Sequence, residues 1–334
     1  MSKKLLLVTT GGTISSRYDP AKGYSPVKGS DPALSAQALL GGAPLPLPGV
    51  EVEVWSFSSI LSFSFTPEMV LELVEGVCKR IQGEEWLGAV VSQGTAMLEE
   101  TPYLADLFWW DERPLVFTGA MFNGSEPDWD GPRNIKNALI AAASPQSRNK
   151  GALVCLGGEI HAARDVLKIH KTSLSPLCSP VCGPLGLVVN GEKAVYYRSP
   201  LRRYMFEERK IDPAVEIVKV AMGTDGAIID ALVALGKKAI VLEALPGGGG
   251  VTPSVYEAVK RNVDKAVFVM CPRSPLGSAV SKAGGGCGPV DLRKLGVITA
   301  GDFTSVKARV FLMAALPYAA SRQELASLFE EVCP

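Results

Sequence analysis

The sequence has no excess of charge of either sign and no long hydrophobic run. Its 334 residues include 34 lysines and arginines and 34 aspartates and glutamates, which gives a formal net charge of zero. A neutral chain does not favour binding to nucleic acid or to an anionic membrane. The apolar run at residues 5–8 is too short for a signal peptide or a membrane span. We therefore expect no nucleic-acid or membrane partner.

Cysteines are few, and their spacing is not that of a metal site. The chain has seven of them, an odd number. Cys178 and Cys182 lie four residues apart, but no second Cys or His pair at zinc spacing accompanies them. An odd count without a recognisable signal segment is typical of reduced thiols in the cytoplasm. We expect a cytoplasmic protein without a bound metal.

Nucleotide-binding loops are also missing, although two glycine-containing turns follow apolar segments. The run LLLV (5–8) leads into TGGTI (10–14), and AVVS (89–92) leads into QGT (93–95). Neither turn contains G-x-G-x-x-G, and the chain has no Walker A motif. Glycines permit a sharp turn and a close approach of the backbone to a ligand. Because open α/β sheets bind ligands at the carboxyl ends of their strands, we expect the two threonine hydroxyls to reach one site.

Strand-like and helix-like segments alternate along the first half, which is typical of a parallel sheet covered by helices. Strands are expected at 5–8, 50–56, 89–92, 114–118 and 151–156. A helix is predicted over 66–82, because Thr66 can cap it and Pro67 suits its first position. Further segments with a recognisable pattern are a helix over 132–143 and a hairpin over 183–197 with Asn190-Gly191 as its turn.

A charged stretch separates this half from a second run of the same pattern. We interpret residues 198–213 as a linker between an N-terminal domain, 1–197, and a C-terminal domain, 214–334. The second domain has expected strands at 215–220, 239–242 and 266–270, and expected helices at 226–235, 253–263 and within 305–331. The predicted fold class is α/β, with a mainly parallel sheet flanked by helices in the larger N-terminal domain and a smaller C-terminal α/β domain.

Several motifs together resemble the bacterial-type L-asparaginase family, the asparaginase- and glutaminase-like amidohydrolases, of which this chain looks like a divergent member. They are TTGGTIS, SQGTAMLEET, TGAM, DGPRN, EIHAARDVLK, GPLGLVVNG and GVITAGDFTSVKARVFLMAAL. The resemblance covers nearly the whole chain. It implies a large and a small domain, and a homodimer or homotetramer whose active sites lie between the N-terminal domain of one subunit and the C-terminal domain of its partner. We expect no cofactor.

The matched positions contain groups that amide hydrolysis requires: a nucleophile, a base and donors for the oxyanion. By resemblance, Thr13 is the nucleophile, Thr95 is the second catalytic threonine and Lys168 is the catalytic lysine. A partly desolvated lysine has a lowered pKa and can act as a base through Thr95. Gly12 and Gly94 bring the backbone close to the substrate. Taken singly, Thr13 reads equally as a helix cap and Lys168 as a surface lysine; the combination of motifs favours catalysis.

A tyrosine in KGYSPVKG (22–29) matches the family's flexible lid, where a tyrosine orients the nucleophile. This residue is Tyr24, and Gly23, Pro26 and Gly29 around it are typical of a mobile loop. The alternative is that the ring merely covers the edge of the sheet.

The second motif departs from the family pattern, H-G-T-D-T-M-E-E-T. Here it reads QGTAMLEET (93–101), so Ala96 replaces an aspartate that holds the α-ammonium of the substrate. That aspartate also belongs to the family's hydrogen-bond network around the catalytic threonine and lysine. Ser62 matches the serine that binds the α-carboxylate, while Phe63 stands where the family has a polar neighbour. The family's G-N-G-N loop aligns with glycines 247–250, so the partner's asparagine contact is absent as well.

These departures affect one part of the substrate, its amino-acid head group. An ammonium bound without its carboxylate is desolvated and unpaired, at a cost of several kcal/mol. We therefore expect a threonine-dependent amidohydrolase acting on an amide, such as a lactam or imide, without the usual α-amino group. Aromatic residues that either line its pocket or belong to the core are Phe63, Phe65, Phe122 and Trp129.

Two other functions remain open. Loss of the aspartate at position 96 is compatible with a non-catalytic or weakly active small-molecule-binding homologue, or with an isomerase that uses the same threonine and lysine. Asp165 is expected to brace the turn before Lys168, and His161 and His170, which flank that lysine, are expected to have a structural or surface role. Glu99 and Glu100 are expected to begin a helix, with Glu99 also a candidate to approach the site.

Overall fold

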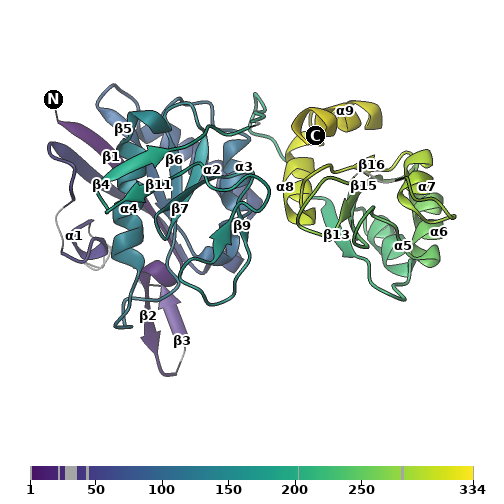
Figure 1. Ribbon diagram of the computed structural model, residues 1–334, viewed down its shortest axis with the longest axis horizontal. Helices are drawn as coiled ribbons and strands as arrows, with labels where there is room; N and C mark the ends of the chain where they lie inside the picture. Colours follow the sequence, from purple (N-terminus) through teal and green to yellow (C-terminus); the bar gives the residue numbers. More distant parts are fainter. Residues whose placement is uncertain are drawn as a thin grey trace. The chain divides into compact units, whose positions relative to one another are not determined.

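The computed structural model describes residues 2–21, 23–26, 36–42, 45–201, 203–279 and 282–333. It consists of unit 1, Met1–Glu207, and unit 2, Glu208–Pro334, each with its own sheet (Figure 1). Both units are α/β, as the sequence predicts.

An eight-stranded mixed sheet forms the centre of unit 1, in the order β12-β11-β8-β7-β6-β5-β1-β4. Its strands are β1 (Lys3–Gly11), β4 (Val50–Ile60), β5 (Trp86–Ser92), β6 (Leu115–Thr118), β7 (Ala152–Leu156), β8 (Glu159–Ala162), β11 (Gly186–Val189) and β12 (Lys193–Tyr196). The strands from β4 to β7 pair in parallel, and β8, β11 and β12 pair antiparallel with their neighbours. The predicted hairpin is β11–β12, with φ of 52° at Asn190 and 66° at Gly191.

Short helices and turns surround this sheet. They are α1 (Ala36–Leu39), α2 (Pro67–Arg80), α3 (Thr101–Asp106) and α4 (Gly131–Ala143), with the 3-10 turns η1 (Thr13–Ser15), η3 (Ser62–Ser64), η4 (Thr95–Met97) and η5 (Pro145–Ser147). The predicted cap of α2 is present, because Thr66 Oγ1 accepts the Met69 N–H at 3.4 Å. Apolar side chains of β1 and α4, such as Leu5 and Leu139, are fully buried in one core cluster.

Two small antiparallel ribbons project from unit 1. One joins β2 (Ser16–Asp19) to β3 (Gly23–Pro26), and the other joins β9 (Leu167–Lys168) to β10 (Leu177–Cys178). The segment Gly23–Pro26, which the sequence suggests to be part of a flexible lid, forms a strand that pairs with β2, and Tyr24 lies opposite Tyr18. The side chain of Tyr24 lies outside the described part of the structure. Interstrand hydrogen bonds offset the weak strand preference of this glycine- and proline-containing segment. Gly29 lies outside the described residues.

Unit 2 contains a parallel sheet of four strands in the order β13-β14-β15-β16. Its elements are β13 (Val215–Lys219), α5 (Ala227–Ala234), β14 (Ala239–Ala244), α6 (Pro253–Asn262), β15 (Val267–Pro272), α7 (Pro289–Lys294), β16 (Ile298–Thr299), α8 (Ser305–Ala315) and α9 (Arg322–Val332). Ile240 and Phe268, on neighbouring strands, are fully buried in its core.

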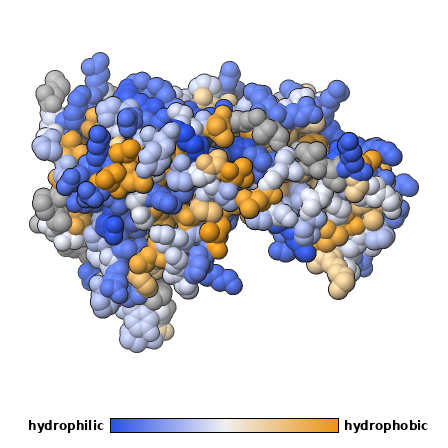
Figure 2. All heavy atoms as spheres, viewed as in Figure 1, coloured by the Kyte–Doolittle hydropathy of each residue, from blue (hydrophilic) through white to orange (hydrophobic). Residues whose placement is uncertain are grey.

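The surface of each unit contains both hydrophilic and hydrophobic residues (Figure 2). Figure 2 shows hydrophilic and hydrophobic residues intermingled on the visible face of each unit. In the described part of the chain, no helix has both the length and the apolar character that crossing a membrane needs.

Candidate active site

The turns after β1, β4 and β5 meet at the carboxyl edge of the unit 1 sheet, since β1 pairs with both other strands. A Cβ built on Gly12 would lie 2.3 Å from the Gly94 backbone nitrogen, and one on Gly94 would lie 2.5 Å from Ser62 Oγ. Only glycine fits these two positions, and Gly12 also has a left-handed φ of 77°. Thr13 and Thr95, each one residue further on, are thereby brought to the same edge.

Hydrogen bonds fix the first turn to both neighbouring strands. Thr10 Oγ1 donates to the Ser92 carbonyl on β5 at 2.9 Å, and Ser58 Oγ on β4 donates to the Thr10 carbonyl at 2.9 Å. The Gly12 N–H donates to the Ile60 carbonyl at 2.9 Å. These bonds satisfy buried backbone groups at the end of β1 and hold the turn rigidly.

Thr13 is the first residue of η1, and its side chain is half-buried. The residue in the capping position is Gly12, so the alternative interpretation of Thr13 as a helix cap is wrong. Among the described residues, no hydrogen bond involves the Thr13 hydroxyl.

Lys168 and Thr95 are in direct contact, although 73 residues separate them in the chain. Lys168 Nζ donates to Thr95 Oγ1 at 2.7 Å, and the Thr95 hydroxyl also lies 3.6 Å from Met121 Sδ. Partial burial lowers the pKa of Lys168 below its ordinary value of 10.5, and the negative charge of Glu99 partly opposes this effect. Lys168 is thus not the solvated surface lysine of the alternative interpretation. Once neutral, its amine can accept the Thr95 proton.

The segments that the sequence predicts to bind substrate lie beside these threonines. Turn η3 contains Ser62 and Phe63, and it packs against η4, which contains Thr95 and Ala96. Ser62 is buried, whereas the Phe63 ring is 69% exposed and Ala96 is exposed. Positions 63 and 96, at which the sequence predicts the loss of polar head-group contacts, therefore expose an aromatic ring and a methyl group.

Two of the four aromatic residues considered for the pocket are core residues. Phe65 is only 8% exposed, and its ring centroid lies 6.0 Å from that of Phe57. Trp129 is partly buried against the core cluster of the sheet and α4. Core packing, the alternative left open by the sequence, thus describes these two, and Phe63 and partly buried Phe122 remain candidates.

Sequence reasoning missed the contacts that link two of the motifs. The Asp130 carboxylate, just before α4, accepts the backbone N–H groups of Met121 and Phe122, at 3.1 and 2.9 Å. Asn134 donates to the Gly119 carbonyl at 3.0 Å and to Asp130 at 2.9 Å. The motifs TGAM and DGPRN therefore form one unit that places Met121 against Thr95. The sequence signal that could have indicated these contacts is the presence of both motifs in one chain.

A buried polar cluster lies behind Lys168. Asp165 pairs with Arg164 at 3.0 Å and accepts from Cys182 Sγ at 3.1 Å, which fits its predicted bracing of the turn. His161 is 1% exposed, and its Nδ1 lies 3.0 Å from Ser179 Oγ. Burial, with a smaller contribution from the charge of Arg198, lowers the pKa of His161 to about 4.

The buried His161 should make unit 1 sensitive to acid. Its pKa is about 4 in the folded state against 6.5 in the unfolded chain, so the unfolded state binds more protons between these values. The free energy of unfolding should therefore fall by roughly 3 kcal/mol as the pH drops from 6.5 to 4. Urea unfolding of wild type and His161→Gln across this range measures the effect.

His170, which is exposed, supplies the matched control. His170→Gln should keep the wild-type pH dependence, whereas His161→Gln should have a shallower one. Equal slopes for wild type and His161→Gln would show that other groups cause the acid sensitivity.

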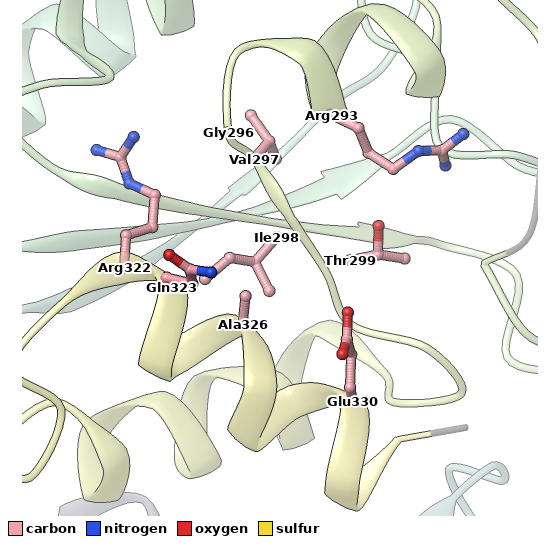
Figure 3. Close-up of a pocket in the computed structure, with 9 residues that line it drawn as sticks. All are labelled: Arg293, Gly296, Val297, Ile298, Thr299, Arg322, Gln323, Ala326 and Glu330. Carbon is pink, nitrogen blue, oxygen red and sulfur yellow. The ribbon is translucent and has the colours of Figure 1, made fainter.

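Two hollows elsewhere on the described surface do not contain this threonine–lysine pair. One, of about 480 Å³, lies between β16 and α9 of unit 2, with Thr299 and Glu330 among its lining residues (Figure 3). The other, of about 710 Å³ in unit 1, is lined by paired charges such as Arg113–Asp111. Among the described residues no hydrogen bond joins Thr299 to Glu330, whereas Lys168 and Thr95 are in contact, so we assign the chemistry to the threonine–lysine site. In the described ranges no group of three or more His, Cys, Asp or Glu side chains is arranged to hold a metal ion.

Comparison with known proteins identifies the family of this chain. The family model "Asparaginase, N-terminal" matches residues 4–202, and "Glutaminase/Asparaginase C-terminal domain" matches residues 214–329. The chain belongs to the L-asparaginase family. The resemblance inferred from the motifs is thereby confirmed, and the protein is an asparaginase-type amidohydrolase, a hydrolase of carbon–nitrogen bonds other than peptide bonds.

Relatives within the L-asparaginase family match along most of the chain. An L-asparaginase of Bacillus licheniformis is 33% identical over 313 residues, covering 93% of this chain and 95% of that protein. A probable periplasmic L-asparaginase of Haemophilus influenzae is 30% identical over 98% of this chain and 92% of its own length. The crystal structure of a probable cytoplasmic L-asparaginase from Campylobacter jejuni is similar with a TM-score of 0.84 and 27% identity, covering 98% and 99% of the two chains.

Proposed function

We propose that this amidohydrolase acts on amides that lack the α-amino group of asparagine, a lactam or imide among them. The observation that carries the proposal is the exposed methyl group of Ala96 beside the Thr95–Lys168 pair. A substrate ammonium placed there would lose water without gaining a carboxylate, at a cost of several kcal/mol. An uncharged or apolar group has no such penalty.

The residues at the carboxyl edge of the sheet have complementary roles in this reaction. Thr13 Oγ attacks the amide carbonyl, and Thr95 relays a proton to neutral Lys168. Tyr24 on β3 orients the nucleophile. The first N–H groups of a helical turn have no acceptor within the turn, so those at the start of η4 are suited to the oxyanion. The proton taken up by Lys168 then passes to the departing nitrogen.

Four further residues form the substrate subsite. Gly12 and Gly94 keep the backbone open to the substrate, and Ser62 lies directly against Gly94. Phe63 supports an apolar substituent, because a ring that is 69% exposed gains by covering its surface with a ligand. We infer that the enzyme is cytoplasmic and forms a homodimer or homotetramer with active sites at the subunit interface.

The alternative substrates are free asparagine and glutamine, after which the matching family models are named. Activity measured on a panel of amides distinguishes these two amino acids from lactams and imides. Wild type should have a higher kcat/KM on lactams or imides than on asparagine. Ala96→Asp should raise kcat/KM for asparagine at least about tenfold, because one well-placed ion pair is worth that much or more. Ammonia release and product mass are the measurements.

Ala96→Asn is the matched control, since it has the size of aspartate without its charge. It should not gain asparaginase activity. Wild-type activity on asparagine equal to or above that on every other amide would overturn the proposal about the head group and leave the amidohydrolase chemistry intact.

A further inference from the structure

Glu99 holds the backbone of the catalytic lysine. Its Oε2 accepts the Lys168 N–H at 3.0 Å, a contact between residues 69 positions apart. Thr95, four residues before Glu99 on the same segment, accepts from the Lys168 Nζ at 2.7 Å. Lys168 is therefore held at both ends by one short stretch of chain, which fixes both the strand position and the direction of its side chain.

Within the described part of the chain, the negative charge of Glu99 also raises the pKa of the Lys168 amine. The turn before β9 contains Asp165 and Arg164, which pair with each other at 3.0 Å. On the paired strand β10, the titratable residue is Cys178, which lies opposite Leu167. Position 96, where the family has a carboxylate within this network, is alanine.

We infer that Glu99 is a positioning residue that fixes Lys168 and supplies the counter-charge for its ammonium, the task for which position 96 has no carboxylate. This inference rests on the proposed function of Lys168 as the base. Because Glu99 contacts the backbone of the lysine, it acts through Lys168.

The role of the Glu99 charge follows from the proton transfers of the catalytic cycle. As Thr13 Oγ bonds to the amide carbon, its proton passes to Thr95 Oγ1, and the Thr95 proton passes to neutral Lys168, which becomes an ammonium. Glu99 stays ionised and stabilises that ammonium, as a carboxylate stabilises the imidazolium of a serine-protease triad. The ammonium then returns the proton, through Thr95, to the leaving nitrogen as the substrate C–N bond breaks, so Lys168 is neutral again. Water, the co-substrate of hydrolysis, then attacks the acyl–Thr13 ester with the same proton relay, which releases the acid and restores the Thr13 hydroxyl.

Three variants separate charge from position. Glu99→Gln keeps an oxygen that can accept the Lys168 N–H but removes the charge, and Glu99→Ala removes both. Glu100→Gln removes a neighbouring charge and is the control. We expect about a tenfold lower kcat/KM plateau for Glu99→Gln and a larger loss for Glu99→Ala. The Glu99 charge raises the Lys168 pKa, so in Glu99→Gln the rising limb of the pH profile should move to lower pH.

Direct titration of the Lys168 amine by NMR in the free enzyme tests the inference without substrate, the signal being assigned by its absence in Lys168→Met. The Lys168 pKa should fall in Glu99→Gln and stay unchanged in Glu100→Gln. An unchanged value in Glu99→Gln would overturn the inference even in a fully active enzyme. Failure to find any hydrolysed amide would instead contradict the proposed function and leave this titration decisive for Glu99.

A further experiment tests whether Glu99 takes the place of a carboxylate at position 96. It measures the effect of Glu99→Gln in an Ala96→Asp variant. If an aspartate at position 96 can supply the negative charge beside the Lys168 ammonium, adding Glu99→Gln to the Ala96→Asp variant should lower kcat/KM by less than about threefold. An equal loss in both backgrounds would show that Glu99 acts independently of what occupies position 96.

Discussion

Replacing Thr13 with alanine should lower kcat/KM for the best amide substrate by at least about 10³-fold, since the variant lacks the attacking atom. The site itself should survive, because Gly12, not Thr13, occupies the capping position of η1 and the neighbouring hydrogen bonds come from Thr10 and Ser58. Ammonia release and product mass report the loss, and the thermal unfolding temperature reports folding.

Thr13→Ser is the matched control, because it keeps the hydroxyl and should retain measurable turnover. Equal activity of wild type and Thr13→Ala on every amide would contradict the nucleophile assignment. A binding homologue would instead be stabilised thermally by a ligand that is never consumed. An isomerase would exchange a substrate C–H with deuterated water and release no ammonia.

Replacing Lys168 with methionine should lower kcat/KM by roughly 10²–10⁴-fold, the usual contribution of a general base. In wild type, activity requires neutral Lys168 and should rise with pH through the pKa of that amine. Because desolvation lowers this pKa below 10.5, the rise should occur below the range of an exposed lysine. Lys168→Met should lose the rise together with the activity. A pH profile of kcat/KM measures both.

Lys171, an exposed lysine three residues further on, provides the control. Lys171→Met should keep the wild-type profile. A Lys168→Met enzyme that retained the same rising limb would show that another group is the base, and would remove the assigned role of the Thr95–Lys168 contact.

Local sequence signals located most of the elements around the site. The apolar run at 5–8 lies within β1, Thr66 and Pro67 mark the start of α2, and Asn190-Gly191 turns the β11–β12 hairpin. Each of these signals depends on residues close in sequence. The two-residue strand β16 and the ribbon β2–β3 were missed, because such short elements are stabilised by pairing with distant or irregular segments and have little pattern of their own.

The candidate residues could be proposed from motifs, but their mutual arrangement could not. The sequence placed Thr95 and Lys168 in separate motifs, and the contact between them at 2.7 Å depends on where β9 lies. Which of Phe63 and Phe65 is exposed also depended on packing, since both are apolar rings within or next to one short turn.

By itself, the sequence determined the α/β fold, the family and the presence of alanine at position 96, because strand periodicity, motifs and residue identity can be read from neighbouring residues in the chain. The tertiary structure decided that Lys168 is partly desolvated against Thr95, that its backbone is held by Glu99, and that glycines 12 and 94 touch. These properties depend on distances between residues far apart in the chain. Burial and charge at the amine, and hence its pKa, follow from such distances and not from composition.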